Sequence, residues 1–337
     1  MGAKIPELAV EKSMNQMLEA TGYTRIHQGK VRDTYRISDK FLLVIATDRL
    51  SIFDFVLPVL IPGKGAVLTA LTHYWLTQVF ADYPHHLVNA GGDLGLNAVH
   101  ELKHELPELD FRRCLVVKDL SNEMLDFEMI FRHHIGGSVY KKYLETGTAG
   151  GHKLPLDLPK WSKLDTPIFT PSTKENVGHD INVDAQYFFE KTGPKGKATV
   201  AMLQEIYKLA YAIAALKGIR ILDTKFEGTL TTIADEILTP DSSRFVDNSD
   251  WETAMLEKRD PDFLDKEPVR IWGKSVETDF DVTGINKLDP VNQEHTAFVH
   301  SLGIPQDIIT TTTNRYNNIF KRITQGTVID LMVKNGC

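Results

Sequence analysis

Residues 23 to 61 contain four short β-prone segments that follow one another with only brief turn sequences between them. The segments are rich in β-branched and aromatic residues. They read YTRIHQG, VRDTYRI, FLLVIAT and FDFVLPVLI, separated by Gly29, Ser38-Asp39 and Asp48-Arg49. Parallel neighbours need a long crossover connection, whereas antiparallel neighbours need only a tight turn. This stretch therefore predicts an antiparallel sheet near the start of the chain.

After this stretch, strand and helix signals are mixed. Pro62-Gly63 ends the strand pattern, and Val67, Leu71 and Tyr74 then recur at helical spacing, which indicates a helix with one buried face. Further strands are expected at 114–120, 127–133, 218–228 and 231–238. Further helices are expected from about 137, at 184–191, at 198–217 and from Ile304-Pro305. Two stretches, 81–110 and 147–183, are expected to be irregular because Gly and Pro interrupt them.

The chain length predicts more than one core. With 337 residues the chain exceeds the size at which a single hydrophobic core keeps growing, so two packed lobes are expected. A hydrophobic fraction of 42% is enough for globular cores and excludes wholesale disorder. Both lobes contain enough apolar residues to fold unaided, so the sequence leaves monomer and homo-oligomer open.

Charge and cysteine usage restrict the partners and the compartment. The net charge is −7 and the basic residues are scattered, which argues against a nucleic-acid or anionic-membrane partner. No apolar run reaches the roughly 18 residues needed to span a bilayer, and the first residues lack the apolar core of a signal peptide. The two cysteines, Cys114 and Cys337, are too few for a disulfide framework. We expect a soluble cytoplasmic protein.

The run Asp223-Thr224-Lys225-Phe226-Glu227 is the main candidate for chemistry. Side chains two apart on a strand share a face, so Asp223, Lys225 and Glu227 would point the same way. A turn centred near Leu230-Thr231 would bring Asp235 nearly opposite Glu227. Opposed carboxylates repel, whereas a divalent cation between them reverses that sign, and hard oxygen ligands suit Mg²⁺. A solvated sheet face on which Lys225 offsets the acids explains the spacing equally well.

Two glycine-containing segments are candidate phosphate sites. Gly136-Gly137-Ser138 stands just before a helix and shortly after Arg132, so backbone N–H groups, a hydroxyl and a guanidinium could cradle a phosphate. Gly29-Lys30-Val31-Arg32 places two cations on one face of a strand. An ordinary loop and an exposed edge strand are the alternative interpretations.

His100-Glu101-Leu102-Lys103-His104 satisfies the HExxH pattern of zinc proteases. Pro107 lies three residues beyond it, which leaves little helix to hold two imidazoles on a metal, and no third ligand is marked. A solvated charged segment is the preferred interpretation. The chain also has no Walker A pattern and no kinase catalytic-loop or DFG motif.

Taken together, these segments resemble the phosphoribosylaminoimidazole-succinocarboxamide synthase family, also called SAICAR synthetases. The resemblance covers most of the chain in the same order, and LDTKFE followed by DEILTPDSSR is its most specific part. The matching stretches are GKVRDTY at 29–35, TDRLSIFDFVLP at 47–58, IPGKG at 61–65, FEMIFRHHIGGS at 127–138, FTPSTK at 169–174, LDTKFEG at 222–228, DEILTPDSSRF at 235–245 and IPQDI at 304–308.

The resemblance implies an α+β fold with two lobes. Residues 1–115 would form an antiparallel, ATP-covering lobe similar to the small lobe of kinases, and residues 116–337 a larger α+β lobe that binds substrates and metal and ends in helices. The implied reaction is the ATP-dependent ligation of L-aspartate to the carboxylate of carboxyaminoimidazole ribotide (CAIR), through an acyl phosphate. Its products are SAICAR, ADP and phosphate, in de novo purine biosynthesis. ATP and Mg²⁺ are the implied cofactors.

The resemblance also implies roles for single residues. Lys225 and Asp223 would be catalytic, with Asp223 orienting Lys225 or accepting a proton from the amine, and Glu227 and Asp235 would hold magnesium. The residues implied to bind ATP are Gly29, Lys30, Val31, Arg32, Glu128 and Lys225. The residues implied to line the ribotide and aspartate side are Asp48, Ser51, Asp54, Lys64, Arg132, Gly137, Ser138, Ser243 and Arg244.

The sequence departs from the family's usual pattern at a few positions. Asp126 stands where Pro is frequent, Gly136 where Thr or Ala is usual, Gly228 where an aromatic residue is common, and Val246 where Trp is frequent. Residues 251–292 match no family motif. Two other functions stay open. One is a small-molecule kinase or a ligase with a different acceptor, and the other is a non-catalytic nucleotide-binding protein.

Overall fold

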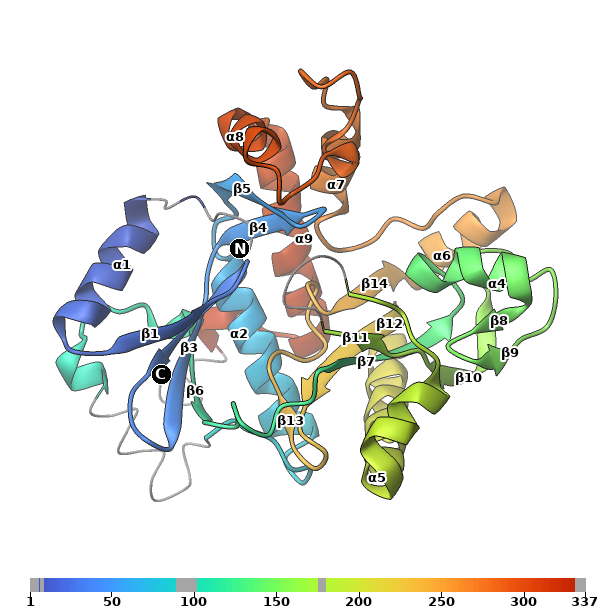
Figure 1. The fold of residues 1–337 in the computed structure, drawn as a ribbon, viewed down its shortest axis with the longest axis horizontal. Coiled ribbons are helices and arrows are strands. Elements are labelled where there is room, and N and C mark those ends of the chain that lie inside the picture. The colour runs from blue at the N-terminus through green and yellow to red at the C-terminus, as the bar shows by residue number, and fades with distance from the viewer. Residues whose placement is uncertain (1–5, 7–8, 89–101, 175–179, 331–337) are drawn as a thin grey trace. The chain divides into compact units, whose positions relative to one another are not determined.

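The computed structural model describes Pro6 and residues 9–88, 102–174 and 180–330 (Figure 1). The chain forms two compact units, each with its own internal contacts. Unit 1 contains Met1–Thr77, His86–Asp119 and Lys266–Cys337, and unit 2 contains Gln78–His85 and Leu120–Asp265. Among the described residues, none of the helices combines the length and the apolar character that crossing a membrane requires.

Unit 1 contains the antiparallel sheet that the opening segments predict. Its strand order is β1-β2-β3-β6, and the four strands lie side by side in Figure 1. Their bounds are β1 (Thr24–Gln28), β2 (Arg32–Arg36), β3 (Phe41–Ala46) and β6 (Cys114–Lys118). The core under this sheet also draws on helix α1 (Ala9–Ala20). Its buried members are Leu18, Tyr35, Leu43, Ile45, Leu102, Leu106, Leu109 and Val116.

The fourth predicted segment forms a strand but does not join this sheet. Strand β5 (Phe55–Leu60) pairs with β4 (Arg49–Ile52) as a separate hairpin. Phe53 and Asp54 connect them with φ angles of 50° and 66°, the left-handed pair that a tight two-residue hairpin turn requires. The expected turn at Asp48-Arg49 is therefore wrong at Arg49, which begins a strand.

Helices from the end of the chain cover this hairpin. In Figure 1, α7 (Glu267–Ser275) and α8 (Gln293–Ser301) lie beside β4 and β5, and α9 (Gln306–Thr324) packs against α2 (Lys64–Tyr74). The buried side chains of this core are Leu50, Ile52, Phe55, Leu57, Ile61, Val269, Ile285, Leu288 and Val299. The observed units thus differ from the expected division into 1–115 and 116–337, because the residues from Lys266 onward group with the first unit.

Unit 2 is built on a six-stranded antiparallel sheet of order β10-β7-β12-β13, in which β11 also pairs with β7 and β14 with β12. The bounds are β7 (Phe127–His134), β10 (Lys163–Phe169), β11 (Ser172–Thr173), β12 (Ile219–Gly228), β13 (Ile233–Ala234) and β14 (Ser243–Asp247). The predicted strands at 127–133 and 218–228 are confirmed, and the one at 231–238 shortens to two residues. The stretch 147–183, expected to be irregular, contains β10, β11 and the small hairpin of β8 (Thr148–Ala149) and β9 (His152–Lys153).

Two helical segments joined at a kink, together labelled α5 (Ala185–Ala215), pack on this sheet. The sequence predicts two helices here, and the chain does break between them: Gly193 has φ 63° and Pro194 follows, a conformation that glycine adopts without a steric cost. Other helical segments among the described residues include α4 (Tyr140–Thr146), α6 (Asn248–Glu257), η1 (Trp75–Val79), η2 (Phe111–Arg113), η3 (Gly137–Val139) and η4 (Ile285–Lys287). Antiparallel sheets with separate helices confirm the predicted α+β class.

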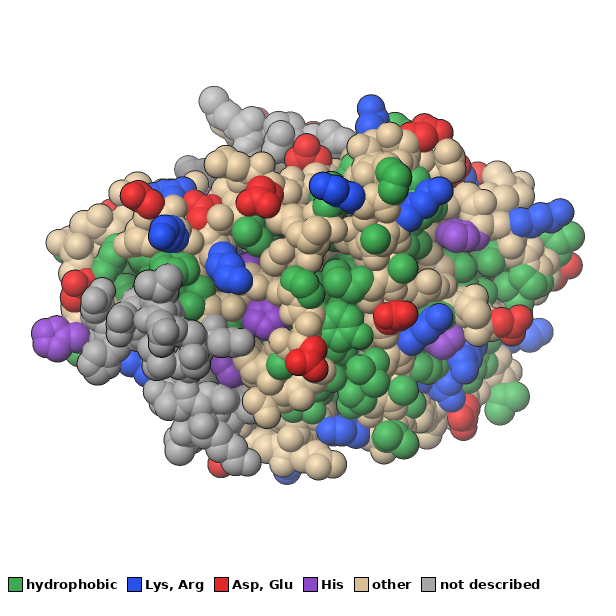
Figure 2. Space-filling model, turned by 90° about the horizontal axis from the view of Figure 1, so that it is seen from below, with side chains coloured by type: hydrophobic (Ala, Val, Ile, Leu, Met, Phe, Trp, Pro, Cys, Tyr) green, Lys and Arg blue, Asp and Glu red, His purple; other side chains and the backbone are tan. Residues whose placement is uncertain are grey.

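One face of the molecule repeats the scattered charge of the sequence (Figure 2). On the face drawn in Figure 2, coloured Lys and Arg side chains are interspersed with Asp, Glu and apolar side chains. A dispersed arrangement of both signs produces only a weak long-range field.

Two adjacent histidines on β7 are buried against α5 and make the fold sensitive to acid. The ring nitrogens of His134 lie 3.0 Å from the Trp161 carbonyl oxygen and 3.2 Å from the Tyr211 hydroxyl. Burial lowers the pKa of His133 to about 4 and that of His134 to about 3. Both pKa values are below the unfolded value of about 6.5, so the unfolded chain binds more protons below that pH.

We therefore expect the free energy of unfolding to be highest above pH 6.5 and to decrease as the pH falls toward 4. Each histidine should account for about 2 kcal/mol between pH 6.5 and pH 5. Urea unfolding at a series of pH values measures this, with His133→Asn expected to flatten the slope. His27 on β1 is exposed, so His27→Asn serves as the control and should leave the slope unchanged. A free energy of unfolding that does not vary with pH in the unaltered protein would contradict the prediction.

Candidate active site

Strand β12 places the predicted chemical residues in the middle of the unit 2 sheet, between β7 and β14. Asp223 and Glu227 are buried, with 4% and 6% of their surface exposed. A solvated sheet face is therefore excluded for these two acids. The residues also separate into two groups, because Lys225 pairs with Glu227 while Asp223 pairs with arginines.

The first group is a lysine enclosed by acids. Lys225 Nζ donates to Glu128 Oε1 on β7 at 2.6 Å and lies 3.0 Å from Glu227 Oε1. Ser172 Oγ donates to the other oxygen of Glu128 at 3.1 Å, and Lys174 forms a second ion pair with Glu227. Burial disfavours the charged forms of these groups, but the attraction between opposite charges is larger and keeps them ionised. Despite that burial, Lys225 and Lys174 lower the pKa of Glu227 to about 2, and Glu227 and Glu128 raise the pKa of Lys225.

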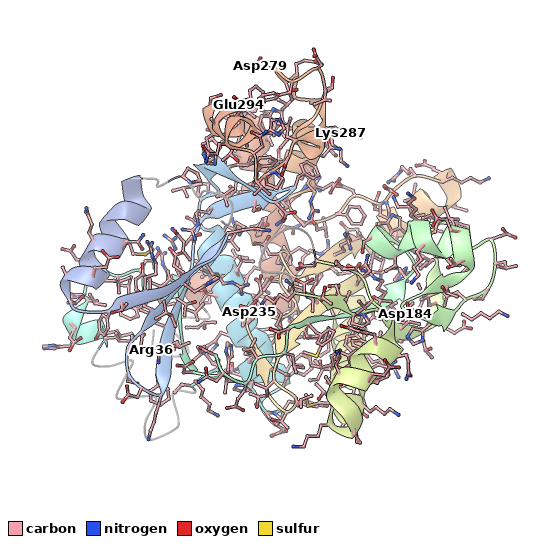
Figure 3. All side chains as sticks on the ribbon, in the orientation of Figure 1. Arg36, Asp184, Asp235, Asp279, Lys287 and Glu294 are labelled. Carbon is pink, nitrogen blue, oxygen red and sulfur yellow. The ribbon has the colours of Figure 1, made fainter. Side chains whose placement is uncertain are left out.

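Asp235 follows β13 directly and has φ 59° (Figure 3). The register pairs Glu227 with Ala234 and Gly228 with Ile233, so the turn lies where it is predicted and Asp235 is one residue from the position opposite Glu227. Burial lowers the pKa of Lys225, but the charges of Glu227 and Glu128 raise it, and the negative charge of Asp235 adds a smaller contribution in the same direction. Three carboxylates thus act on one ammonium group.

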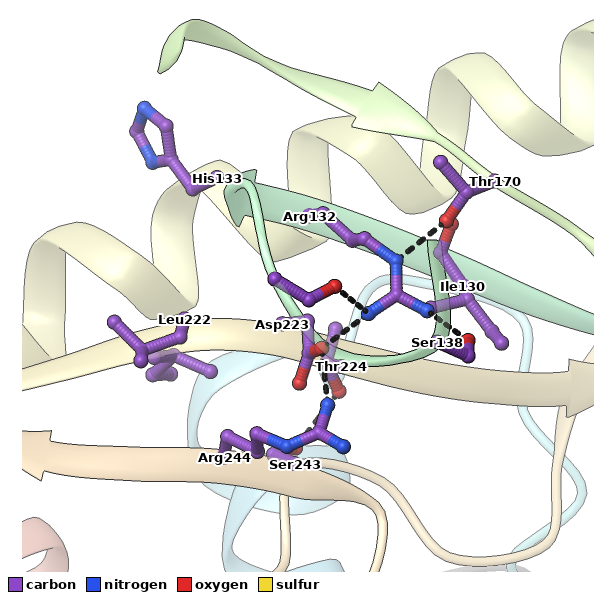
Figure 4. A network of polar contacts seen from close by, with 12 residues as sticks. Ile130, Arg132, His133, Ser138, Thr170, Leu222, Asp223, Thr224, Ser243 and Arg244 are labelled. Carbon is purple, nitrogen blue, oxygen red and sulfur yellow. Dashed lines mark hydrogen bonds and ion pairs between the residues drawn. The ribbon is translucent and has the colours of Figure 1, made fainter. Parts of the chain in front are cut away.

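The second group is a pair of arginines on one carboxylate (Figure 4). Asp223 Oδ2 accepts hydrogen bonds from the NH1 groups of Arg132 and Arg244, each at 2.5 Å. Arg132 also donates from Nε to Thr170 Oγ1 at 2.9 Å, and its side chain is only 3% exposed. The Arg244 side chain is 32% exposed. Arg132 is therefore fixed inside the sheet, and Arg244 presents the accessible guanidinium.

The predicted glycine segment faces these arginines. Gly137 has φ 63°, and a Cβ there would lie 3.1 Å from NH1 of both Arg132 and Arg244. Ser138 Oγ lies 3.5 Å from Arg132 NH2, and Ser243 Oγ lies 2.8 Å from Thr224 Oγ1 beside Asp223. The structure therefore brings together the predicted substrate residues of unit 2, and this arrangement of guanidinium groups and small residues suits an anionic ligand.

The remaining predicted residues lie in unit 1. In the turn of Gly29 to Arg32, the Gly29 N–H donates to the Arg32 carbonyl at 2.7 Å, and Lys30 forms an ion pair with Asp54. Val31 accepts hydrogen bonds at its carbonyl from both the N–H and the hydroxyl of Thr47.

The Asp48 carboxylate accepts from the N–H groups of Gly63 and Gly65, at 3.2 and 2.7 Å, and so holds the start of α2. Lys64 in this segment is buried, with Nζ 5.7 Å from the centre of the Tyr316 ring. Ser51 is buried in β4. Asp48 therefore contacts the backbone on either side of Lys64.

Arg49 is a residue that the sequence interpretation misses. It is fully buried and contacts both Asp33 oxygens, at 2.7 and 3.1 Å. It also donates to the carbonyls of Gly29 at 2.9 Å and Lys30 at 3.1 Å. Arg49 therefore holds the predicted phosphate-binding turn from beneath. The available signal was an arginine directly before the apolar residue Leu50 in a β-prone segment.

Replacing Arg49 with Lys should destabilise the protein by about 3 kcal/mol. An ammonium group cannot reproduce the planar fork that contacts Asp33 and both carbonyls, and breaking a buried pair leaves buried charge uncompensated. Urea unfolding measures the change. The exposed pair of Arg112 and Asp110 provides a matched control, since Arg112→Lys should change stability by less than about 1 kcal/mol. Equal effects of the two substitutions would refute the role of Arg49.

His100 and Glu101 of the HExxH segment lie outside the described residues, so the zinc-protease interpretation of that segment is not tested by the structure. Within the residues that the structure describes, no group of three or more His, Cys, Asp or Glu side chains is arranged to hold a metal ion.

The sequence was compared with known protein families and curated proteins. The family model for SAICAR synthetase matches residues 25–285. The phosphoribosylaminoimidazole-succinocarboxamide synthase of Mannheimia succiniciproducens is 38% identical over 313 residues, which cover 89% of this chain and 98% of that protein. The synthase of Thermodesulfovibrio yellowstonii is 38% identical over 321 residues, covering 92% and 99%.

The fold was compared with solved structures. The SAICAR synthase of Saccharomyces cerevisiae, solved in complex with SAICAR, is similar with a TM-score of 0.73 and 31% identity, covering 90% of this chain and 96% of that one. A SAICAR synthetase solved in complex with ADP has a TM-score of 0.57 at 20% identity, which supports the fold. The expected SAICAR synthase-like fold is confirmed.

Proposed function

This chain belongs to the SAICAR synthetase family, and on that premise we propose how its residues carry out the reaction. The protein is a ligase that forms a C–N bond. It uses ATP to join the amine of L-aspartate to the carboxylate of CAIR, in purine biosynthesis. Its partners are these small molecules.

The chemistry requires activation of a carboxylate. A free carboxylate is a poor acylating agent because its leaving group would be an oxide. The CAIR carboxylate oxygen attacks the γ-phosphorus of ATP, ADP leaves, and an acyl phosphate forms. The aspartate amine then attacks the acyl carbon, the C–O bond to phosphate breaks, and the amine loses a proton. The contribution of the protein is positioning and charge stabilisation.

The observation that carries the assignment is that β12 holds two different groups of charged side chains close together. Asp223 holds two guanidinium groups, and Lys225, two residues further on, presents an ammonium group among acids. Side chains at this spacing on one strand face are about 6–7 Å apart. A ribotide anchored by its anionic groups at Arg132 and Arg244 would thus hold its carboxylate near Lys225, where charge develops during phosphoryl transfer.

The contacts of Asp223 favour a role that differs from both sequence-based alternatives. Its carboxylate is engaged by Arg132 and Arg244, so we assign it to anchoring the arginines rather than to orienting Lys225 or accepting a proton. Gly137, Ser138 and Ser243 complete the ribotide side in this proposal.

In unit 1, we assign the turn of Gly29, Lys30, Val31 and Arg32 to the ATP phosphates, as part of a nucleotide-covering lobe. We assign Asp48, Ser51, Asp54 and Lys64 to the ribotide and aspartate side. We assign Glu128 to nucleotide binding. Arg49 holds the Gly29–Arg32 turn through the carbonyls of Gly29 and Lys30.

The Mg²⁺ that the family resemblance implies fits the acids of β12 and β13. Glu227 is ionised, with a pKa of about 2, and it already attracts two ammonium groups. Magnesium is commonly bound by one or two carboxylates together with substrate phosphates, which suits Glu227 and Asp235. When bound, the ion supplies positive charge that offsets the charge on the phosphoryl oxygens.

Replacing Glu227 with Gln should weaken Mg²⁺-dependent nucleotide binding by about tenfold or more, because a charged hard ligand becomes neutral. Titration calorimetry with a non-hydrolysable ATP analogue, at a series of Mg²⁺ concentrations, measures this without turnover. The exposed Glu252 serves as the control through Glu252→Gln. An unchanged Mg²⁺ requirement in Glu227→Gln would remove Glu227 from the metal site.

An omission assay tests the function itself. Purified protein receives ATP, Mg²⁺, aspartate and CAIR, with each component left out in turn, and the products are identified by mass spectrometry. We expect SAICAR only in the complete mixture. Phosphorylated product without aspartate would identify a kinase, and no turnover of any mixture would favour a non-catalytic binder. We also propose a cytoplasmic location, since two cysteines are too few for a disulfide framework.

A further inference from the structure

Trp161 lies beside the accessible arginine of the ribotide side but belongs to none of the sequence motifs. The Arg244 guanidinium carbon is 5.6 Å from the centre of the Trp161 ring. Asp223 contacts the NH1 group of the same guanidinium. Arg244 is therefore held at one end by a carboxylate and lies over an aromatic face, an arrangement that is favourable for a planar cation.

The indole is immobilised from several directions. Trp161 is 2% exposed and has φ 66°. Its N–H donates to the Ile135 carbonyl at 2.7 Å, and its indole Nε1 donates to Asp260 at 2.9 Å. Its carbonyl oxygen accepts from Trp251 Nε1 at 3.0 Å and lies 3.0 Å from the His134 ring. A left-handed non-glycine residue persists only where its surroundings over-determine it, and these bonds do so.

The backbone next to the six-membered ring of the indole carries no side chain, because residue 136 is glycine. Gly136 has extended backbone angles, so its lack of a side chain is not a conformational requirement. A Cβ at this position would overlap the six-membered ring of Trp161. On another side, the indole packs in a core with Leu222, Val246 and Phe263. Gly136 is a position where this chain departs from the family pattern, and the Trp161 ring accounts for the absence of a side chain there.

We propose that Trp161 is a positioning residue for Arg244, and that its indole face, admitted by Gly136, fixes the guanidinium that receives the anionic group of the ribotide. This inference rests on the proposed function. The physical basis is the difference between the two arginines. Arg132 is fixed by Thr170 and Asp223, whereas Arg244 has fewer described contacts and a third of its side chain exposed. A guanidinium that lies over an aromatic face keeps its other N–H groups available for a bidentate contact with a phosphate.

A consequence follows for binding rather than for chemistry. Without the indole, Arg244 would sample more rotamers and would lose that freedom on binding the ribotide, which weakens affinity. Nucleotide binding, which we assign to other residues, should not change. The expected signature is therefore a loss in ribotide affinity with unaltered nucleotide affinity.

A double-mutant cycle tests the inference. SAICAR binding is measured by titration calorimetry for the unaltered protein, Trp161→Leu, Arg244→Met and the double variant, with ADP as the second ligand. Trp161→Leu should weaken SAICAR binding about tenfold, the middle of the range for a cation–π contact. In the Arg244→Met background the same substitution should change it less than about twofold. Equal losses in the two backgrounds, or an equal loss for ADP, would overturn the proposal.

Gly136→Ala provides a complementary measurement. Its methyl group should displace the indole and weaken SAICAR binding in the unaltered protein, but should be tolerated in Trp161→Leu, where the ring is absent. Equal losses from Gly136→Ala in both would contradict the proposal. If thermal melting shows that Trp161→Leu does not fold, Trp161→Phe replaces it in the cycle, with a smaller loss that again depends on Arg244.

The omission assay separates this inference from its premise. No SAICAR formation by the unaltered protein would overturn the proposed function. SAICAR formation together with losses that do not depend on Arg244 would overturn only the role of Trp161.

Discussion

Ligation should decrease by about 10²–10³-fold when Lys225 is replaced by Met, the loss expected when one preorganised charge is removed from a developing anionic centre. Lys225 Nζ lies 2.6 Å from Glu128 and 3.0 Å from Glu227, so its position does not depend on the substrate. Met retains most of the length and volume of the side chain but carries no charge. The rate constant at saturating substrates is the quantity to measure.

The pH dependence of the same variant gives an independent check. Lys225 is a main reason why the pKa of Glu227 is about 2 despite its burial. A group with a lowered folded pKa contributes stability above its unfolded pKa, near 4.5, and that stability is lost as the pH falls toward 2. In Lys225→Met the pKa of Glu227 should rise, so this contribution should be smaller at neutral pH and acid unfolding should begin at a higher pH.

Lys142 provides the matched control for Lys225. It forms an ion pair with Asp184 at 3.0 Å, but both side chains are about half exposed. Lys142→Met should change stability by less than about 1 kcal/mol and leave the rate unaltered. If Lys225→Met retained a normal rate while Lys142→Met behaved as described, Lys225 would have no part in phosphoryl transfer.

The second large effect is expected for Asp223→Asn, which should destabilise the protein by about 3–5 kcal/mol. The substitution keeps the shape of the side chain but removes the charge that compensates Arg132, whose side chain is 3% exposed. Burial lowers the pKa of Arg132 and the Asp223 charge opposes that effect. The variant therefore leaves a buried guanidinium without its counter-charge, and urea unfolding measures the cost.

Ribotide binding should fall together with stability in Asp223→Asn, because Arg132 and Arg244 lose the shared carboxylate that holds them. Asp110→Asn is the control, since Asp110 binds Arg112 through two oxygens on the surface. Calorimetry with SAICAR and with ADP, at a temperature where the variant is folded, separates the two ligands. Normal SAICAR affinity in folded Asp223→Asn would exclude the anchoring role.

Local patterns in the sequence determined several elements of this fold. The β-branched and aromatic segments in residues 23–61 predict β1, β2 and β3, and the helical spacing after Gly63 predicts α2. The alternation of side chains along a strand places Asp223, Lys225 and Glu227 on one face, and the turn near Leu230 is where the register requires it. These features depend on residues a few positions apart, and side-chain periodicity and turn chemistry encode such short-range relations directly. The ordered motifs were likewise enough to indicate the family.

The partners of these elements were decided only in the tertiary structure. Strand β6 pairs with β3, which lies about 70 residues earlier in the chain, the helices after Lys266 cover the β4–β5 hairpin, and Arg49 forms an ion pair with Asp33. Asp223 forms ion pairs with two arginines instead of pairing with Lys225, and the Arg244 guanidinium lies over the Trp161 ring. The physical reason is that such contacts join residues far apart in the chain. Their formation depends on which surfaces remain to be buried once the local elements exist, and that information is absent from any short window of sequence.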